Sequence, residues 1–291
     1  MLIKGSLWCA AVLAVAVASP AQAASAPAAA PVREPAASAP PAVPGRAAYL
    51  IDATTGTVHH AKSATRRLPV ASLTKVMTAY VVLAEAGDLG DTVTVTTGDV
   101  RHAAANGATH AALRAGERLT TRDLLYALML PSGADAAHAL ARRYGPGTTR
   151  FVAKMNTAAR SLGLANTRYT NPDGLSVPSG GYSTAKDQVR LAFAALGDPT
   201  LRQISTTGRH AVPRTAVHHA HTWHNTNKLL GAAPGAIGVK TGYTRAAGYC
   251  LLYAAEREEH LLIGVILGDT QADRRFETAE RLLEWTDATA P

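Results

Sequence analysis

The sequence predicts an α+β protein in which both ends of the chain build one antiparallel sheet and the middle supplies helices. Segments with the alternating apolar pattern of strands lie near residue 50 and again after residue 237. Helical periodicity and helix-stop residues dominate the stretch between them. With 47% hydrophobic and 17% charged residues, the chain of 291 residues can bury a sizeable core. We therefore expect an antiparallel sheet flanked by helices, with the central helices forming an all-helical subdomain.

The first half of the chain is expected to begin with a hairpin over residues 47–63, turning at Thr55 and Gly56. A helix over residues 72–87 should end at Gly87. The remaining expected elements are extended pieces at 91–100 and 109–120, two helices within 120–145 broken at Pro131, and a helix over Phe151–Leu162 stopped by Gly163.

The second half is expected to start with a helix over residues 184–198 and then to change to strand patterns. The expected strands cover residues 238–244, 248–256 and 260–268, and a closing helix covers about Asp273 to Trp285. No internal repeat is visible.

The N-terminus has the features of a secretory signal peptide. Lys4 precedes an apolar run, and small residues in an A-x-A arrangement indicate cleavage after Ala23, so residues 1–23 are the predicted signal peptide. Residues 24–45 are mostly alanine and proline and predict an extended linker, which places the folded domain at residues 46–291. We expect a secreted or extracytoplasmic envelope protein, with membrane contact only if the N-terminal segment stays uncleaved.

Charge and cysteine content narrow the function classes. The net charge is +8, but no basic run interleaved with aromatic residues appears, and aromatics total 5%, so no nucleic-acid partner is expected. Only seven residues are lysines, which makes a lysine inside a motif informative. Cleavage of the signal peptide would leave Cys250 as the one cysteine, and its apolar surroundings predict a buried packing residue.

Two serines stand three residues before a lysine, Ser72 with Lys75 and Ser183 with Lys186. On a helix this spacing places both side chains on one face, roughly 5–6 Å apart between Cβ atoms. The lysine can accept the serine proton only when it is neutral, and a free lysine titrates near a pKa of about 10.4. A working pair therefore needs an apolar environment and a second positive charge nearby.

Context separates the two pairs. Thr184 and Asp187 match a capping box, so Ser183 is interpreted as part of a helix start. Ser72 instead enters a strongly apolar helix just after Pro69, although a simple N-cap role is the alternative for it.

A second motif favours Ser72. Lys240, Thr241 and Gly242 form a strand segment in which a cation and a hydroxyl can hold a carboxylate, and the bare glycine lets a peptide lie along the strand edge. Between the motifs, Ser132 follows Pro131 at a helix start, where an N-cap role with Asp135 and a catalytic role are about equally supported.

The three motifs "SLTK", "SGA" and "KTG", in this order and spacing, resemble those of the penicillin-binding serine enzymes. The strings "LIDATTGTV", "TNPDGL", "NTNKLLG" and "PGAIGVKTGYTRAAGYCL" sharpen the likeness to the D-alanyl-D-alanine carboxypeptidases, the low-molecular-mass penicillin-binding proteins. The likeness runs from about Ala47 to the end of the chain. It implies a β-lactamase/transpeptidase-like fold and removal of the terminal D-alanine from peptidoglycan stem peptides.

The resemblance also implies residue roles. Ser72 would be the acylated nucleophile, Lys75 its general base, and Ser132 a relay of a proton to the departing D-alanine. Lys240 would provide the second positive charge that keeps Lys75 neutral.

The substrate site is implied in the same way. Lys240 and Thr241 of the "KTG" motif, which Gly242 completes, would hold the terminal carboxylate, and the backbone N–H groups of Ser72 and Tyr243 would form the oxyanion hole. Either Arg274 or Arg275, with Arg275 preferred, would add to the carboxylate site. β-Lactams would be inhibitors, and neither a cofactor nor a metal is implied.

One departure from the family pattern is Ala134, where asparagine usually stands. The resemblance implies that this asparagine contacts the substrate amide, so we expect an active enzyme with altered substrate binding and rate. Two alternatives follow. A class A β-lactamase would need a glutamate for the deacylating water, and residues 163–185 contain none. A non-catalytic or weakly active cell-wall-binding relative is favoured only by Ala134.

A histidine-rich stretch, residues 210–224, is the last candidate site. Alternating histidines on a strand can bind zinc, but neither cysteine nor an acidic residue accompanies them in the sequence. We interpret the stretch as a solvated hairpin with incidental metal affinity.

Overall fold

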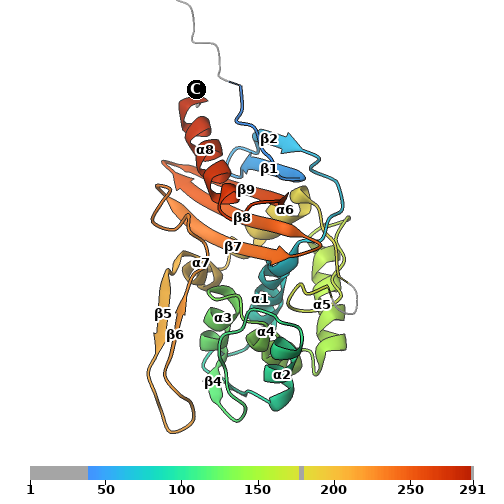
Figure 1. The fold of residues 1–291 in the computed structure, drawn as a ribbon, viewed down its shortest axis with the longest axis vertical. Helices are drawn as coiled ribbons and strands as arrows, with labels where there is room; N and C mark the ends of the chain where they lie inside the picture. Colours follow the sequence, from blue (N-terminus) through green and yellow to red (C-terminus); the bar gives the residue numbers. More distant parts are fainter. Residues whose placement is uncertain (1–38, 177–179, 290–291) are drawn as a thin grey trace, which may run out of the picture. The chain divides into compact units, whose positions relative to one another are not determined.

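The computed structural model describes residues 39–176 and 180–289 (Figure 1). Its main feature is a five-stranded antiparallel sheet with the order β2-β1-β9-β8-β7. The strands are β1 Ala47–Asp52, β2 Val58–Lys62, β7 Ala236–Thr244, β8 Gly248–Arg257 and β9 His260–Asp269. Because β1 pairs directly with β9, the predicted sheet from both ends of the chain is confirmed.

Helices cover both faces of this sheet, and the strands alternate accordingly. Leu251 and Tyr253 of β8 belong to the core beneath α8 (Arg274–Thr289), whereas Cys250 and Leu252 belong to the larger core on the other face. This alternation is the period of two expected of a strand buried on both faces. Cys250 is fully buried, as predicted.

The middle of the chain forms the predicted helical cluster below the sheet, and β7 is the strand nearest to it (Figure 1). Its elements are a 3-10 turn η1 Ala71–Leu73 and helices α1 Thr74–Glu85, α2 Thr97–Ala105, α3 Thr121–Met129, α4 Ala134–Tyr144 and α5 Thr148–Ser161. Two more helices, α6 Ala185–Leu196 and α7 Pro199–Thr206, lead back towards the sheet. Helix α6 packs against β1 and β9 as part of the larger core.

Two short hairpins complete the fold. Strand β3 (Thr92–Thr94) pairs with β4 (Arg118–Thr120), and β5 (Arg209–Val212) pairs with β6 (His221–His224). The second hairpin contains the histidine-rich stretch and extends beside α3 (Figure 1).

Helices α2 and α7 were not expected from the sequence. The run "TVTVTT" before α2 has strand character, but Thr96 ends it, because its hydroxyl accepts from Asp99 N while the Asp99 carboxylate accepts from Thr96 N. Helix α7 begins with Asp198 as N-cap and Pro199 in the first turn, which is a recognisable start signal.

The described chain begins inside the predicted linker. Val43 is buried in the core beneath α8, and its carbonyl accepts a hydrogen bond from Lys62 Nζ at 2.6 Å. The predicted signal peptide, residues 1–23, and most of the linker lie outside the described residues and stay predictions. Within the described ranges, no helix combines the length and the apolar character that a membrane crossing requires.

The packing between β8 and β9 generates a stability prediction. Gly264 stands opposite Tyr253 in the register, and an added Cβ would overlap the fully buried tyrosine ring. We expect Gly264→Ala to lower the free energy of unfolding by about 1–3 kcal/mol, as overpacked cores do. Gly87→Ala is the matched control, because its Cβ would meet nothing within 4 Å. Urea denaturation of both variants checks this, and equal midpoints would contradict it.

Candidate active site

Ser72 and Lys75 form a hydrogen-bonded pair at the start of α1. Ser72 lies on the 3-10 turn, which the chain enters through Ala71 with a φ of 51°, in the left-handed region. Lys75 Nζ donates to Ser72 Oγ at 2.9 Å and to the backbone oxygen of Asp173 at 2.8 Å. The predicted meeting of the two side chains on one helix face is therefore present in the structure.

Burial gives Lys75 the properties of a base. Its side chain is 1% exposed, and this desolvation lowers its pKa from the usual 10.5 to about 8, against the opposing charges of Asp173 and Asp135. A fraction of about one tenth is then neutral at pH 7 and can accept a proton.

The edge strand β7 brings the second motif to Ser72. A Cβ on Gly242 would lie 3.1 Å from both Ser72 N and Val70 O, so the glycine lets the strand run directly against the turn that carries Ser72. Thr241 is buried, and its hydroxyl shares a 2.6 Å hydrogen bond with that of Thr226. Because β7 is the last strand of the sheet, it offers an edge to an extended peptide.

Lys240 is as deeply buried as Lys75. Burial is the largest cause of its strongly lowered pKa, and the charges of Lys75 and Arg275 lower it further. The sequence assigned the lowered pKa of Lys75 partly to Lys240, whereas burial is the main cause for each lysine. Their mutual repulsion favours a state in which one of the two is neutral.

Ser132 has a buried hydroxyl that no described group hydrogen-bonds. The residue has a φ of 67° and lies between α3 and α4. Its N-cap interpretation is wrong, because Gly133 occupies the N-cap position of α4 without a side-chain cap bond. The carboxylate of Asp135 instead accepts hydrogen bonds from backbone N–H groups, including Ala111 N at 2.9 Å and Ala136 N at 2.9 Å.

Ala134, which follows Gly133, is the first residue of α4 and is 1% exposed. Its N–H donates to Thr109 O at 2.9 Å. The backbone of the "SGA" motif, residues 132–134, is thus held in place, while position 134 offers no amide side chain.

The two arginine candidates differ in their partners. Arg275 Nη1 donates to Gly242 O at 3.1 Å, and its guanidinium lies 5.2 Å from the centre of the Tyr249 ring. Arg274 is instead tied to Asp269, with Nη2 2.6 Å from Oδ1. The structure therefore places Arg275, and not Arg274, against the "KTG" strand. Tyr243, which is 54% exposed, stacks on Tyr249 at 4.3 Å.

The second serine–lysine pair is not assembled. Ser183 is fully buried, and its hydroxyl bonds to Thr167 and Gln188, while Lys186 is exposed. Thr184 is the N-cap of α6 and accepts from Asp187 N at 3.0 Å, so the predicted helix start is confirmed.

The histidine-rich hairpin differs from the expectation of a solvated element. His221 is 8% exposed, and Glu117, from another part of the chain, accepts from both His219 and His221. The sequence could not show this acidic partner, because it lies about one hundred residues away. Within residues 39–176 and 180–289, no group of three or more His, Cys, Asp or Glu residues is arranged to hold a metal ion.

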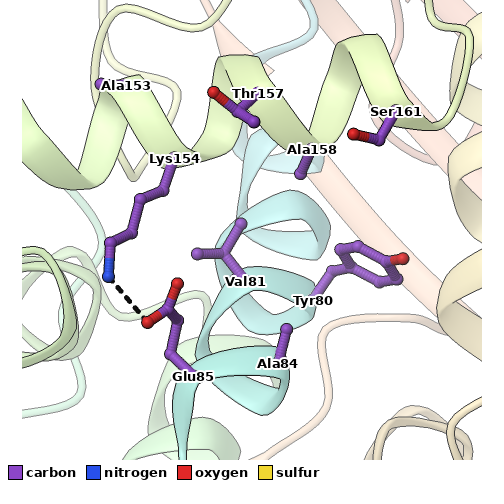
Figure 2. Close-up of a pocket in the computed structure, with 9 residues that line it drawn as sticks. All are labelled: Tyr80, Val81, Ala84, Glu85, Ala153, Lys154, Thr157, Ala158 and Ser161. Atoms are coloured by element: carbon purple, nitrogen blue, oxygen red, sulfur yellow. Dashed lines mark hydrogen bonds and ion pairs between the residues drawn. The ribbon is translucent and has the colours of Figure 1, made fainter.

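Two surface cavities lie apart from these motifs. The first cavity, of about 350 Å³, lies between α1 and α5 and is lined largely by apolar atoms (Figure 2). At one end of it, Lys154 Nζ lies 2.7 Å from Glu85 Oε2. The other, of about 390 Å³, lies beside the β5–β6 hairpin near Glu117 and His219. Neither is lined by Ser72, Lys75 or Lys240.

Sequence reasoning assigned no role to Thr226 or to Asp173. Both lie in strings that carried the family likeness, "NTNKLLG" and "TNPDGL", and these strings were the available signal. Their contacts, to Thr241 and to Lys75, could be seen only in three dimensions.

The chain is similar to known proteins over most of its length. A protein-family model described as D-alanyl-D-alanine carboxypeptidase matches residues 34–271. The chain is 38% identical over 256 residues to a D-alanyl-D-alanine carboxypeptidase of Streptomyces sp. (strain K15), covering 84% of this chain and 88% of that protein. It is 36% identical over 263 residues to a D-alanyl-D-alanine carboxypeptidase of Mycobacterium tuberculosis, covering 89% and 88%.

Solved structures show the same fold. The crystal structure of the Streptomyces K15 DD-transpeptidase superposes with a TM-score of 0.82 at 39% identity, covering 86% of this chain and all of that one (100%). A D-alanyl-D-alanine carboxypeptidase from Mycobacterium tuberculosis H37Rv gives a TM-score of 0.81 at 32% identity, with 88% and 96% covered. The β-lactamase/transpeptidase-like fold class implied by the motifs is confirmed.

Proposed function

The chain belongs to the D-alanyl-D-alanine carboxypeptidase family, and we propose that it removes the terminal D-alanine from peptidoglycan stem peptides ending in D-Ala-D-Ala. The observation that carries the proposal is the 2.9 Å hydrogen bond between Ser72 Oγ and the fully buried Lys75 Nζ. This pair has the geometry of a nucleophile and its general base.

In the first step, Ser72 Oγ attacks the carbonyl carbon of the penultimate D-alanine while its proton passes to neutral Lys75. The C–N bond to the terminal D-alanine then breaks, and the leaving amine takes a proton. Ser132 is suited to relay that proton, because its buried hydroxyl keeps a free hydrogen-bonding capacity in the described structure. Water then hydrolyses the acyl-enzyme on Ser72 and regenerates the free serine.

The "KTG" strand supports recognition of the terminal carboxylate. The substrate would pair with the edge of β7, with its carboxylate near Lys240, Thr241 and Arg275. A carboxylate bound there stabilises the positive charge on Lys240, and repulsion between the two lysines then favours the neutral form of Lys75. Substrate binding thus promotes the form of Lys75 that the reaction needs.

The oxyanion would be held by backbone N–H groups of Ser72 and Tyr243. The close approach of Gly242 to Ser72 N supports this, because it brings the two backbones side by side. Removing one such donor typically costs a factor of about 10²–10³ in rate. β-Lactams, which offer a carboxylate and a strained amide, would acylate Ser72 by the same route.

The proposed site of action is the extracytoplasmic cell envelope, where this substrate is found. The predicted signal peptide of residues 1–23 supports that location. The proposed steps use water and the side chains and backbone groups of the chain, and they invoke no cofactor or metal.

Labelling with a fluorescent penicillin tests the nucleophile. We expect stoichiometric covalent labelling of the wild type and none of Ser72→Ala, because the acyl-enzyme forms on that hydroxyl. Lys186→Ala is the matched control from the other serine–lysine pair and should label normally, since its side chain is exposed. An unlabelled wild type would falsify the enzymatic proposal, and D-alanine release from a D-Ala-D-Ala peptide then tests the peptidase activity itself.

The lowered pKa of Lys75 predicts the pH dependence of acylation. Only the neutral amine accepts the Ser72 proton, so the second-order rate constant should be low in acid and rise through a midpoint at about pH 8. Stopped-flow acylation between pH 5 and 10 measures this midpoint. A rise centred near 10.4, the pKa of a free lysine, would show that burial does not tune this base.

A further inference from the structure

The residue that accepts the second hydrogen bond of Lys75 is itself paired with a histidine. Asp173 offers its backbone oxygen to Lys75 Nζ at 2.8 Å, and its carboxylate Oδ2 lies 2.7 Å from His102 Nε2. The Asp173 side chain is 0% exposed and that of His102 is 25% exposed. The mechanism proposed above assigns no role to this pair.

We propose that His102 is a positioning residue for Lys75: it holds the Asp173 carboxylate, so that the Asp173 carbonyl stays in place on Lys75 and the carboxylate charge beside Lys75 is balanced. This inference rests on the proposed function, because it gives His102 a role in activating the base of that reaction.

The loop around Asp173 is fixed by hydrogen bonds and packs against the start of α1. Asn171 Oδ1 accepts from Gly174 N at 2.7 Å, and Thr78 Oγ1 of α1 donates to Pro172 O at 2.6 Å. Gly174 has a φ of 83°, and a Cβ there would overlap the backbone oxygen of Ala71. A shift of Asp173 would therefore displace the backbone oxygen that accepts the hydrogen bond of Lys75.

His102 ties this loop to the helical cluster. It lies on α2, whereas Asp173 follows α5 and Lys75 lies on α1. The imidazole also stacks on His138 of α4 with ring centres 4.5 Å apart. His138 in turn bonds through Nδ1 to Asp99 Oδ1 at 3.0 Å, so the ring that packs on His102 is fixed as well.

Charges of both signs surround His102. The groups that act on it are Asp173, Lys75, His138 and Asp99. Arg142 balances Asp99, with which it pairs at 2.9 Å. Hydrogen bonding to Asp173 raises the pKa of His102, and the charge of Lys75 opposes that rise. The Asp173 charge in turn raises the pKa of Lys75. When His102 is protonated, its charge offsets the carboxylate charge that raises the pKa of Lys75.

Three variants separate position from charge. His102→Ala removes both the hydrogen bond and the charge, His102→Gln keeps a donor at the place of Nε2 without a charge, and Asp173→Asn keeps an acceptor without the carboxylate charge. His224→Gln, an exposed histidine on β6, is the matched control. The measurement is the second-order rate of acylation by a fluorescent penicillin as a function of pH, with thermal melting of each variant to establish that it is folded.

We expect His102→Ala to lower acylation at pH 7 by about 10- to 100-fold, as misplaced catalytic groups do, and His102→Gln to recover part of the loss. The acylation rate constant rises with pH as Lys75 loses its proton. The midpoint of this rise should move to higher pH in His102→Gln and to lower pH in Asp173→Asn, by about half a pH unit or more in each case. His224→Gln should match the wild type.

Two outcomes overturn the inference. In one, the histidine variants and Asp173→Asn keep the wild-type rate and midpoint. In the other, His102→Ala loses activity, His102→Gln recovers none of it and no midpoint moves, which would assign His102 a purely structural role. Both outcomes leave the proposed function standing as long as the wild type is acylated on Ser72. Failure of wild-type labelling contradicts the proposed function itself.

Discussion

The burial of Lys75 is the constraint on which the rest of the site depends. Burying a charged ammonium group away from water costs free energy, so the pKa of Lys75 falls. Its hydrogen-bond partners must then be neighbouring groups of the protein. Ser72 comes from the 3-10 turn that precedes α1, but Asp173 comes from a loop almost one hundred residues away. A base of this kind therefore requires the whole helical cluster to be closed around α1, and it cannot be built from the local motif alone.

The sheet and the helical cluster must also be held against each other, and Thr226 makes this connection. Its N–H donates to Leu130 O at 3.1 Å, at the end of α3, and its hydroxyl meets that of Thr241 in β7. The segment that carries Ser132 and the strand that carries Lys240 are thus linked through one residue. This bridge explains why the two groups proposed to act on the leaving amine and on the carboxylate can share one substrate.

The sequence predicted what local patterns encode and missed what only tertiary contacts create. The five strands of the sheet and the break at Pro131 follow from periodicity and turn residues, so they could be predicted. Spacing alone gave two serine–lysine pairs, and the "KTG" motif was needed to favour Ser72. Helix α2 could not be told from an extended segment, because the threonine-rich run before it favours a strand. The pairing of His102 with Asp173 joins positions 71 residues apart, and no local pattern in the sequence indicates it.

The backbone of the "SGA" motif is held in place by the residues on either side of Ala134. Gly133 has no room for a side chain, because a Cβ there would lie 2.7 Å from Ala127 O, and Asp135 is tied to backbone N–H groups of the 111–113 segment. These neighbours hold the chain in its turn whichever residue stands between them. We therefore expect alanine at position 134, where the family pattern has asparagine, to leave the backbone turn of Ser132 in place. Lys75 keeps its hydrogen bonds to Ser72 and Asp173 without an amide at this position, so we expect the alanine to affect contacts with the substrate instead.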